Sequence, residues 1–168
     1  MDEKDYVRET KDHIFMVQRL VWSIIPHLNG QVAKHDASKL DSPEKEAFMK
    51  AIPKLKDAAY GSDEYKEALK DIKPATDHHN AVNRHHIEHH KDGVLDMSLI
   101  DIIEMLADWK AASTRHKDGD IIKSIDIGQN RFGFSDELAQ ILKNTAIRMQ
   151  PDWDAIAWEG GQLNSSNE

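Results

Sequence analysis

The sequence contains no cysteine. Disulfide bonds and thiolate zinc sites are therefore impossible, and any bound metal ion must take nitrogen and oxygen ligands. A chain without disulfides is natural in the cytoplasm, which is the location we expect. The sequence also lacks an apolar run of the roughly 20 residues that span a bilayer. Its first residues, MDEKDYVRETKDH, are charged and contain no signal-peptide core, so we expect no membrane partner.

Basic residues are outnumbered, with 22 Lys and Arg against 30 Asp and Glu and a net charge of -8. This balance argues against a duplex nucleic-acid partner, because such a partner requires a basic face. An anionic small molecule remains compatible, since bound metal ions can invert the local field. A length of 168 residues and a hydrophobic content of 39% predict one globular domain over residues 1–158, followed by a flexible tail over residues 159–168.

Strand signals are also missing. No segment alternates apolar and polar residues convincingly over six positions, and glycine-rich phosphate loops and a G-x-S-x-G elbow are absent. Apolar residues instead recur at helical spacing over residues 5–25, 99–112 and 136–149, and shorter helices are predicted over residues 43–51 and 64–72. The sequence therefore predicts an all-α fold.

The most unusual stretch is Asp77–His90, DHHNAVNRHHIEHH, which holds six of the ten histidines. Imidazole is the commonest neutral metal ligand. If this stretch is one helix, His79 and His86 lie seven residues apart and point the same way to within about 20°. His78 and His85 would form a second such pair. The alternative is a solvated polar helix whose histidines bind nothing, because His-rich tracts are only compositional support for a metal site.

Two further histidines are candidate ligands. His13 lies on the apolar stripe of the first predicted helix, where a core histidine that binds no metal is the simpler interpretation. His35 precedes Asp36 directly, and a carboxylate beside an imidazole can bridge two metal ions while the histidine caps one of them. The alternative for this pair is an ordinary His-Asp dipeptide.

An acidic line marks the most apolar predicted helix, residues 99–112. Asp101, Glu104 and Asp108 lie at positions i, i+3 and i+7 of this helix. They face either water or a polar site inside the bundle. Burial of these carboxylates would require metal ions or cationic side chains as partners.

The candidate ligands follow the order His13, His35-Asp36, His79, His85-His86, Asp108. This order resembles the HD superfamily of metal-dependent phosphohydrolases. In that family the late Asp tends to follow Ala on an apolar helix, as in MLADW here, so the resemblance favours Asp108 over Asp101. HDASK resembles the H-D-x-x-K form of binuclear members, including diadenosine tetraphosphate hydrolases and cyclic-dinucleotide phosphodiesterases. HHIEHHKDG is similar to a stretch of the latter, whose G-Y-P signature is absent here. The chain also resembles an uncharacterised family of small phage and bacterial proteins, which adds no known activity.

The HD resemblance implies an HD-like helical bundle with a metal site between helices. It implies two divalent ions (Mn, Fe, Co, Ni or Zn) that share Asp36 about 3.5–4 Å apart and hydrolyse a phosphate ester or anhydride of a nucleotide or dinucleotide. Lys39 and Arg84 would neutralise phosphate oxygens, and Glu88 or Glu104 would orient a ligand. The expected catalytic residues are Asp36, Lys39 and Glu88, and the expected metal ligands are His13, His35, Asp36, His79, His85, His86 and Asp108. A homodimer is compatible with this assignment, since related small nucleotidases are often dimers.

Two other functions remain open from the sequence. A diiron oxygenase of the same fold, like the inositol-oxygenase branch, uses a similar set of four histidines and two aspartates. A protein that binds or senses metal without catalysis would have a closed site saturated by protein ligands, whereas a catalytic site keeps one position open.

Overall fold

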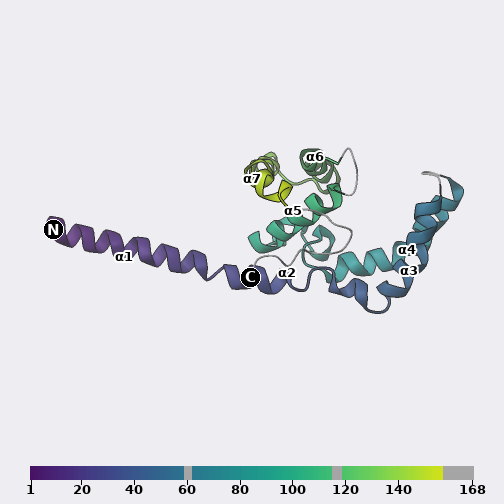
Figure 1. The fold of residues 1–168 in the computed structure, drawn as a ribbon, viewed down its shortest axis with the longest axis horizontal. Coiled ribbons are helices and arrows are strands. Elements are labelled where there is room, and N and C mark those ends of the chain that lie inside the picture. The colour runs from purple at the N-terminus through teal and green to yellow at the C-terminus, as the bar shows by residue number, and fades with distance from the viewer. Residues whose placement is uncertain (59–61, 115–118, 157–168) are drawn as a thin grey trace. The chain divides into compact units, whose positions relative to one another are not determined.

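The computed structural model describes residues 1–58, 62–114 and 119–156, all of which fold into helices and connecting turns (Figure 1). Within these ranges there are seven α-helices, three short 3-10 helices and no strand. The predicted all-α class is therefore confirmed. The predicted tail, residues 159–168, lies outside the described ranges. In the part of the chain that the structure covers, none of the helices is long and apolar enough to cross a membrane.

The chain divides into two compact units, Met1–Glu104 and Met105–Glu168. The prediction of a single domain over residues 1–158 stays a prediction. The first unit begins with α1 (Glu3–Trp22) and α2 (Ile25–Val32). It continues with the elements η1 (Ala37–Leu40), α3 (Glu44–Asp57), α4 (Asp63–Val82), η2 (Ile87–His89), η3 (Gly93–Asp96) and the start of α5 (Leu99–Ser113).

Helices α3 and α4 pack against each other in the first unit (Figure 1). The buried contacts are mainly small side chains, Ala51 on α3 and Ala68 and Ala75 on α4, joined by Ile72. Small residues at these positions allow the two backbones to approach closely. The Ser62 hydroxyl caps the start of α4 by accepting a hydrogen bond from the Tyr65 amide at 3.1 Å. This packing fixes the end of α4, where the first cluster histidines lie.

The interpretation of Asp77–His90 as one helix is wrong. α4 runs through Pro74 and ends at Val82, after which Asn83 takes an extended conformation and the chain turns. His79 belongs to the last turn of α4, whereas His85 and His86 lie in the turn that follows. The side chain of Ile87 in η2 is 6% exposed and anchors this turn in the core. The histidines therefore converge because the chain reverses, not because they share a helix face.

The first predicted helix forms, but its apolar stripe is not covered. α1 contains no buried residue, and Ile14, Val17 and Val21 are 44–55% exposed. The helix ends at Trp22, and Pro26 lies at the start of α2 instead of terminating a single helix. The expectation that this stripe packs into a core is therefore not met within the described residues.

The second unit contains the rest of α5 with α6 (Ile121–Phe132) and α7 (Asp136–Asp154). Its buried side chains include Met105, Ile125 and Leu142, one from each helix. The Ser135 hydroxyl caps α7 by accepting a hydrogen bond from the Leu138 amide. α6 and α7 pack against each other. Gly128 on α6 allows Trp109 of α5 to lie against the α6 backbone, because a Cβ atom at position 128 would overlap the indole ring.

We predict that Gly128→Ala destabilises the second unit. The added methyl group would overlap Trp109, and overpacking of this kind costs about 1–3 kcal/mol, which exceeds the roughly 1 kcal/mol that alanine gains over glycine in a helix. Gly30→Ala on α2 is the matched control, because a Cβ atom at position 30 would have no neighbour within 4 Å. Thermal unfolding should show a lower Tm for Gly128→Ala and an unchanged or higher Tm for Gly30→Ala. A Gly128→Ala protein as stable as the wild type would contradict this packing.

Candidate metal centre

The candidate ligands come from turns and helix ends of the first unit. Asp36 lies between α2 and η1 with a φ of 55°, in the left-handed region that aspartate tolerates better than most residues. Such a conformation costs about 1–3 kcal/mol and persists only where the surrounding structure determines it. His79 ends α4, and His85 and His86 follow in the next turn. These positions place the side chains close together although up to 50 residues separate them in the chain.

Four side chains form one compact group: Asp36, His79, His85 and His86. One ligand atom from each lies within 4.8 Å of the others. His79 and His85 are each 3% exposed. The Asp36 Oδ1 atom lies 3.1 Å from His79 Nε2 and 3.5 Å from His85 Nε2. Two imidazole nitrogens thus approach one carboxylate oxygen and His86 completes the group, with nitrogen and oxygen donors that suit a transition metal ion.

Two buried glutamates hold the far sides of these rings. His79 Nδ1 donates a hydrogen bond to Glu44 Oε2 at 2.9 Å. His85 Nδ1 lies 3.3 Å from Glu104 Oε1. Because an ionised carboxylate can only accept, it keeps the ring proton on Nδ1 and leaves the Nε2 lone pair directed toward Asp36. Metal-binding histidines in proteins are usually oriented in this way.

Glu44 is the centre of its own hydrogen-bond network. Its side chain is fully buried in the first turn of α3 and accepts from Ser38 Oγ at 2.9 Å and from His78 Nδ1 at 2.7 Å, in addition to His79. Asn83 in turn donates to Ser38 Oγ at 2.8 Å. Burial alone would raise the pKa of the Glu44 carboxyl, but the hydrogen bonds from His78, Ser38 and His79 outweigh it and hold that pKa below its usual range. The carboxylate is therefore ionised when it orients His79.

The inner atoms of the group face one another as hydrogen-bond acceptors. Asp36 Oδ1, His79 Nε2 and His86 Nε2 are buried and form no hydrogen bond. Burial and the nearby rings of His85 and His79 lower the pKa of His86 to about 3, so its ring is neutral at pH 7. Lone pairs that face each other repel, and a proton or a metal cation between them removes the repulsion. The donor set therefore fits a divalent ion.

The second oxygen of Asp36 has a different partner. Oδ2 accepts from the Lys39 ammonium at 2.5 Å and lies 3.6 Å from His35 Nε2. Burial would raise the pKa of Asp36, yet its interactions with His79 and Lys39 are stronger and lower it. Lys39 is therefore paired with Asp36 and is not available to an incoming phosphate in this arrangement.

A second group of possible ligands consists of His35, His85 and Glu104. Glu104 Oε1 accepts from His35 Nδ1 at 2.9 Å and also faces His85 Nδ1. A Glu104 carboxylate that accepts from His85 Nδ1 supports an ion on the opposite nitrogen, so this group is better explained as the outer support of the first one. The Asp36 group is thus the better candidate of the two for holding an ion, and the expectation of two ions stays a prediction.

The start of α5 is fixed beside the cluster by an ion pair between a buried Asp101 and a half-exposed Arg84. Asp101 is 0% exposed and accepts two hydrogen bonds from Arg84, at 3.0 and 2.9 Å. Gln31 Nε2 bridges Asp101 and Glu104 at 2.9 and 2.7 Å. Two of the three acidic residues predicted as a line on this helix are therefore buried with cationic or amide partners. The Arg84 guanidinium is paired with Asp101, just as the Lys39 ammonium is paired with Asp36.

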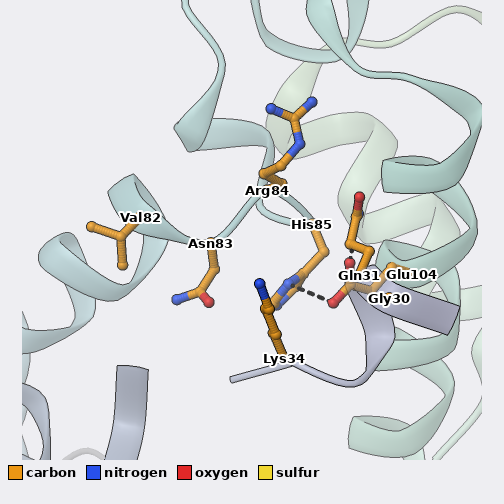
Figure 2. A pocket seen from close by; sticks show the side chains of 8 residues that line it. All are labelled: Gly30, Gln31, Lys34, Val82, Asn83, Arg84, His85 and Glu104. Atoms are coloured by element: carbon orange, nitrogen blue, oxygen red, sulfur yellow. Dashed lines mark hydrogen bonds and ion pairs between the residues drawn. The ribbon is translucent and has the colours of Figure 1, made fainter. Parts of the chain in front are cut away.

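A pocket of about 330 Å³ opens beside the cluster (Figure 2). Its wall is formed by the end of α2, by residues 82–85 and by Glu104, and it includes the cluster ligand His85. Figure 2 shows the Lys34 side chain pointing toward the space between Asn83 and His85. A small molecule in this pocket would therefore lie next to one of the candidate metal ligands.

The structure brings together five of the seven predicted metal ligands, namely His35, Asp36, His79, His85 and His86. His13 is exposed on α1 and belongs to neither group, and Asp108 lies in the second unit. Their roles as ligands stay predictions, as does the catalytic role of Glu88, an exposed residue whose carboxylate accepts from Asn80 at 3.3 Å. His89 and His90 bind the backbone carbonyls of Ala81 and Arg84 instead of joining the cluster.

Glu44 is the residue that sequence reasoning missed. Its position in the first turn after Ser42-Pro43 indicates only a favourable charge at a helix N-terminus. Its partners His78 and His79 lie more than 30 residues away, and nothing in the local pattern predicts that contact. Glu104 was expected as an orienting residue, and the structure places it against His35 and His85 as that role requires.

We predict that His79→Gln removes most of the metal affinity while His89→Ala leaves it unchanged. Glutamine fills a similar volume but cannot present the Nε2 lone pair, and loss of a ligand should exceed the roughly 10–100-fold that loss of a supporting group costs. Titration calorimetry with Zn²⁺ or Mn²⁺ measures both, after circular dichroism has shown that both variants fold. Equal losses for the two variants would mean that ions bind the His-rich stretch diffusely.

We also predict that Glu44→Gln lowers metal affinity by about 10–100-fold, because the neutral amide orients His79 less strongly and supports less negative charge at Nε2. Glu46→Gln is the matched control on the same helix, since Glu46 is exposed. The same calorimetric titration serves for both. A Glu44→Gln affinity equal to that of the wild type, in a folded protein, would show that Glu44 only packs the helix end.

Comparison with known proteins yields one match. Residues 2–148 fit the model of a family of unknown function, DUF5662. Neither the curated proteins nor the solved structures give a match to the chain. The matched region includes every residue of the Asp36 cluster and both supporting glutamates. Because it covers most of the sequence, the chain belongs to the DUF5662 family of unknown function.

Proposed function

We propose that this protein is a metal-dependent phosphohydrolase whose ion is held by Asp36, His79, His85 and His86. The observation that carries the proposal is the set of buried acceptors around Asp36 Oδ1, with His79 and His85 oriented from behind by Glu44 and Glu104. The resemblance of the ligand order to the HD superfamily supports phosphate chemistry, and nucleotides or dinucleotides are the substrates that this resemblance suggests.

Some residues of the site would hold the ion, and others would set the charge around it. A divalent ion supplies Lewis-acid polarisation of a phosphoryl oxygen and lowers the pKa of a bound water. The two glutamates keep the imidazole protons on Nδ1, so the Nε2 atoms remain available as ligands. Lys39 offsets the charge of Asp36 Oδ2. Asp36, Glu44 and Glu104 outnumber this single ammonium, so with neutral imidazoles the cluster is negatively charged and attracts a cation.

The pocket favours catalysis over a purely structural ion. Structural zinc sites are closed by four protein ligands, whereas catalytic sites leave a position open to water or substrate. Asp36, His79, His85 and His86 would close a tetrahedral ion but would leave positions open on an octahedral ion such as Mn²⁺. Here the pocket reaches His85, so a molecule of solvent or substrate has access to the edge of the site. The group also contains residues with different exposure, because His79 and His85 are buried while Asp36 and His86 are partly accessible.

We predict that protein loaded with Mn²⁺ or Co²⁺ releases phosphate or nucleoside from at least one member of a nucleotide and phosphate-ester panel. Asp36→Asn should lower kcat/KM by at least about 100-fold, because asparagine keeps the left-handed backbone conformation but removes the carboxylate that faces the ion. Asp41→Asn, an exposed change of the same kind five residues away, should leave turnover unchanged.

The competing functions give different results in the same assays. Stoichiometric metal binding without hydrolysis of any substrate on the panel would contradict the phosphohydrolase proposal and favour a binding or sensing role. Oxygen consumption and an optical change after anaerobic loading with iron would instead identify an oxygenase. Hydrolysis that persists in Asp36→Asn would place the chemistry outside this cluster.

A further inference from the structure

The pocket beside the cluster is lined by a cation that takes no part in holding the ion. Lys34 lines this pocket just after the end of α2, and it makes no ion pair with any of the described residues. The two other candidate cations near the site differ, because Lys39 is paired with Asp36 and Arg84 with Asp101. Lys34 is thus the basic residue of the pocket wall whose charge is available to a ligand.

We propose that the pocket binds the phosphoryl group of a compact phosphate monoester, with the Lys34 ammonium paired to phosphate oxygens beside His85. This inference rests on the proposed function and replaces the sequence-based assignment of phosphate binding to Lys39 and Arg84. An ammonium is a common partner for phosphate oxygens, and a long flexible stem lets it follow the anion. Figure 2 shows that Lys34 points toward the pocket space next to His85, whereas the Arg84 guanidinium points away from it.

Glu104 is an apparent obstacle, because its carboxylate also lines the pocket. Both oxygens of the Glu104 carboxylate already accept hydrogen bonds. Oε1 accepts from His35 at 2.9 Å, and Oε2 accepts from Gln31 at 2.7 Å. Gln31 is held at the same time by Asp101, so these donors remain in place. The repulsion between Glu104 and a bound phosphate is therefore reduced, and Lys34 with the ion site supplies the attraction.

The size and lining of the pocket narrow the substrate class. A volume of about 330 Å³ is at the small end of the roughly 300–1,000 Å³ typical of ligand pockets. Val82 is the one large apolar side chain of its wall, and no Phe, Tyr or Trp lines it among the described residues. A nucleobase would therefore find little stacking surface, since His85 is 3% exposed, and a dinucleotide would extend beyond the pocket. The pocket favours a monoester of a small polar alcohol over a dinucleotide.

The test uses the full-length protein loaded with Mn²⁺ and inorganic phosphate as the probe, measured by calorimetry. Lys34→Gln should weaken phosphate binding about tenfold, the loss expected for one charge-assisted contact. Lys34→Arg should retain binding, and Lys50→Gln, which removes an exposed charge from α3, should match the wild type. Phosphate that binds Lys34→Gln as tightly as the wild type, or does not bind the metal-loaded wild type, would overturn the proposal.

Substrate kinetics separate this inference from the proposed function. Glycerol phosphate should compete with inorganic phosphate better than a dinucleotide does, and Lys34→Gln should raise the KM for a monoester more than it lowers kcat. If phosphate binding depends on Lys34 but no ester is turned over, the proposed phosphate pocket is supported and the phosphohydrolase proposal is contradicted. Turnover with a KM that is insensitive to Lys34→Gln would support the hydrolase and contradict the pocket.

Discussion

The hydrogen bonds that imidazole rings donate to buried glutamates determine the geometry of this site. Glu44 holds His79, and Glu104 faces both His35 and His85. Without these carboxylates the rings could rotate or exchange tautomers, and their Nε2 atoms would no longer converge on Asp36. The cost of burying two glutamates is offset by several donors each, which is the condition under which buried charge is tolerated. A polar cluster of this kind is specific, because every member depends on the others.

The fold supplies this geometry through element ends and not through helix faces. Helix α3 presents Glu44 in its first turn, and α4 presents His79 in its last. The turn after α4 then brings back His85 and His86, and Ile87 anchors it in the core. Turns can direct adjacent side chains into one small volume, whereas a helix spreads them around its axis.

Sequence reasoning therefore succeeded with the residue types and failed with the path of the backbone. The helical periodicity could be read from local patterns, and the candidate donors His35, Asp36, His79, His85 and His86 could be chosen from the sequence and its resemblance. The end of α4 at Val82 could not be predicted from the sequence, because tertiary packing determines it. Glu44 was equally hidden, since a contact over 34 positions leaves no local signal. The apolar stripe of α1 is exposed because no described element covers it. Helical periodicity alone does not predict whether such a stripe is covered.

The most direct test of the central claim is anomalous diffraction from crystals of the metal-loaded protein, recorded on both sides of the metal absorption edge. The account predicts an anomalous peak bounded by Asp36 Oδ1 and the Nε2 atoms of His79, His85 and His86, with Glu44 and Glu104 at the outer nitrogens of His79 and His85. A structure without a peak there, or with the ion held only by exposed residues such as His78, His89 and His90, would contradict it.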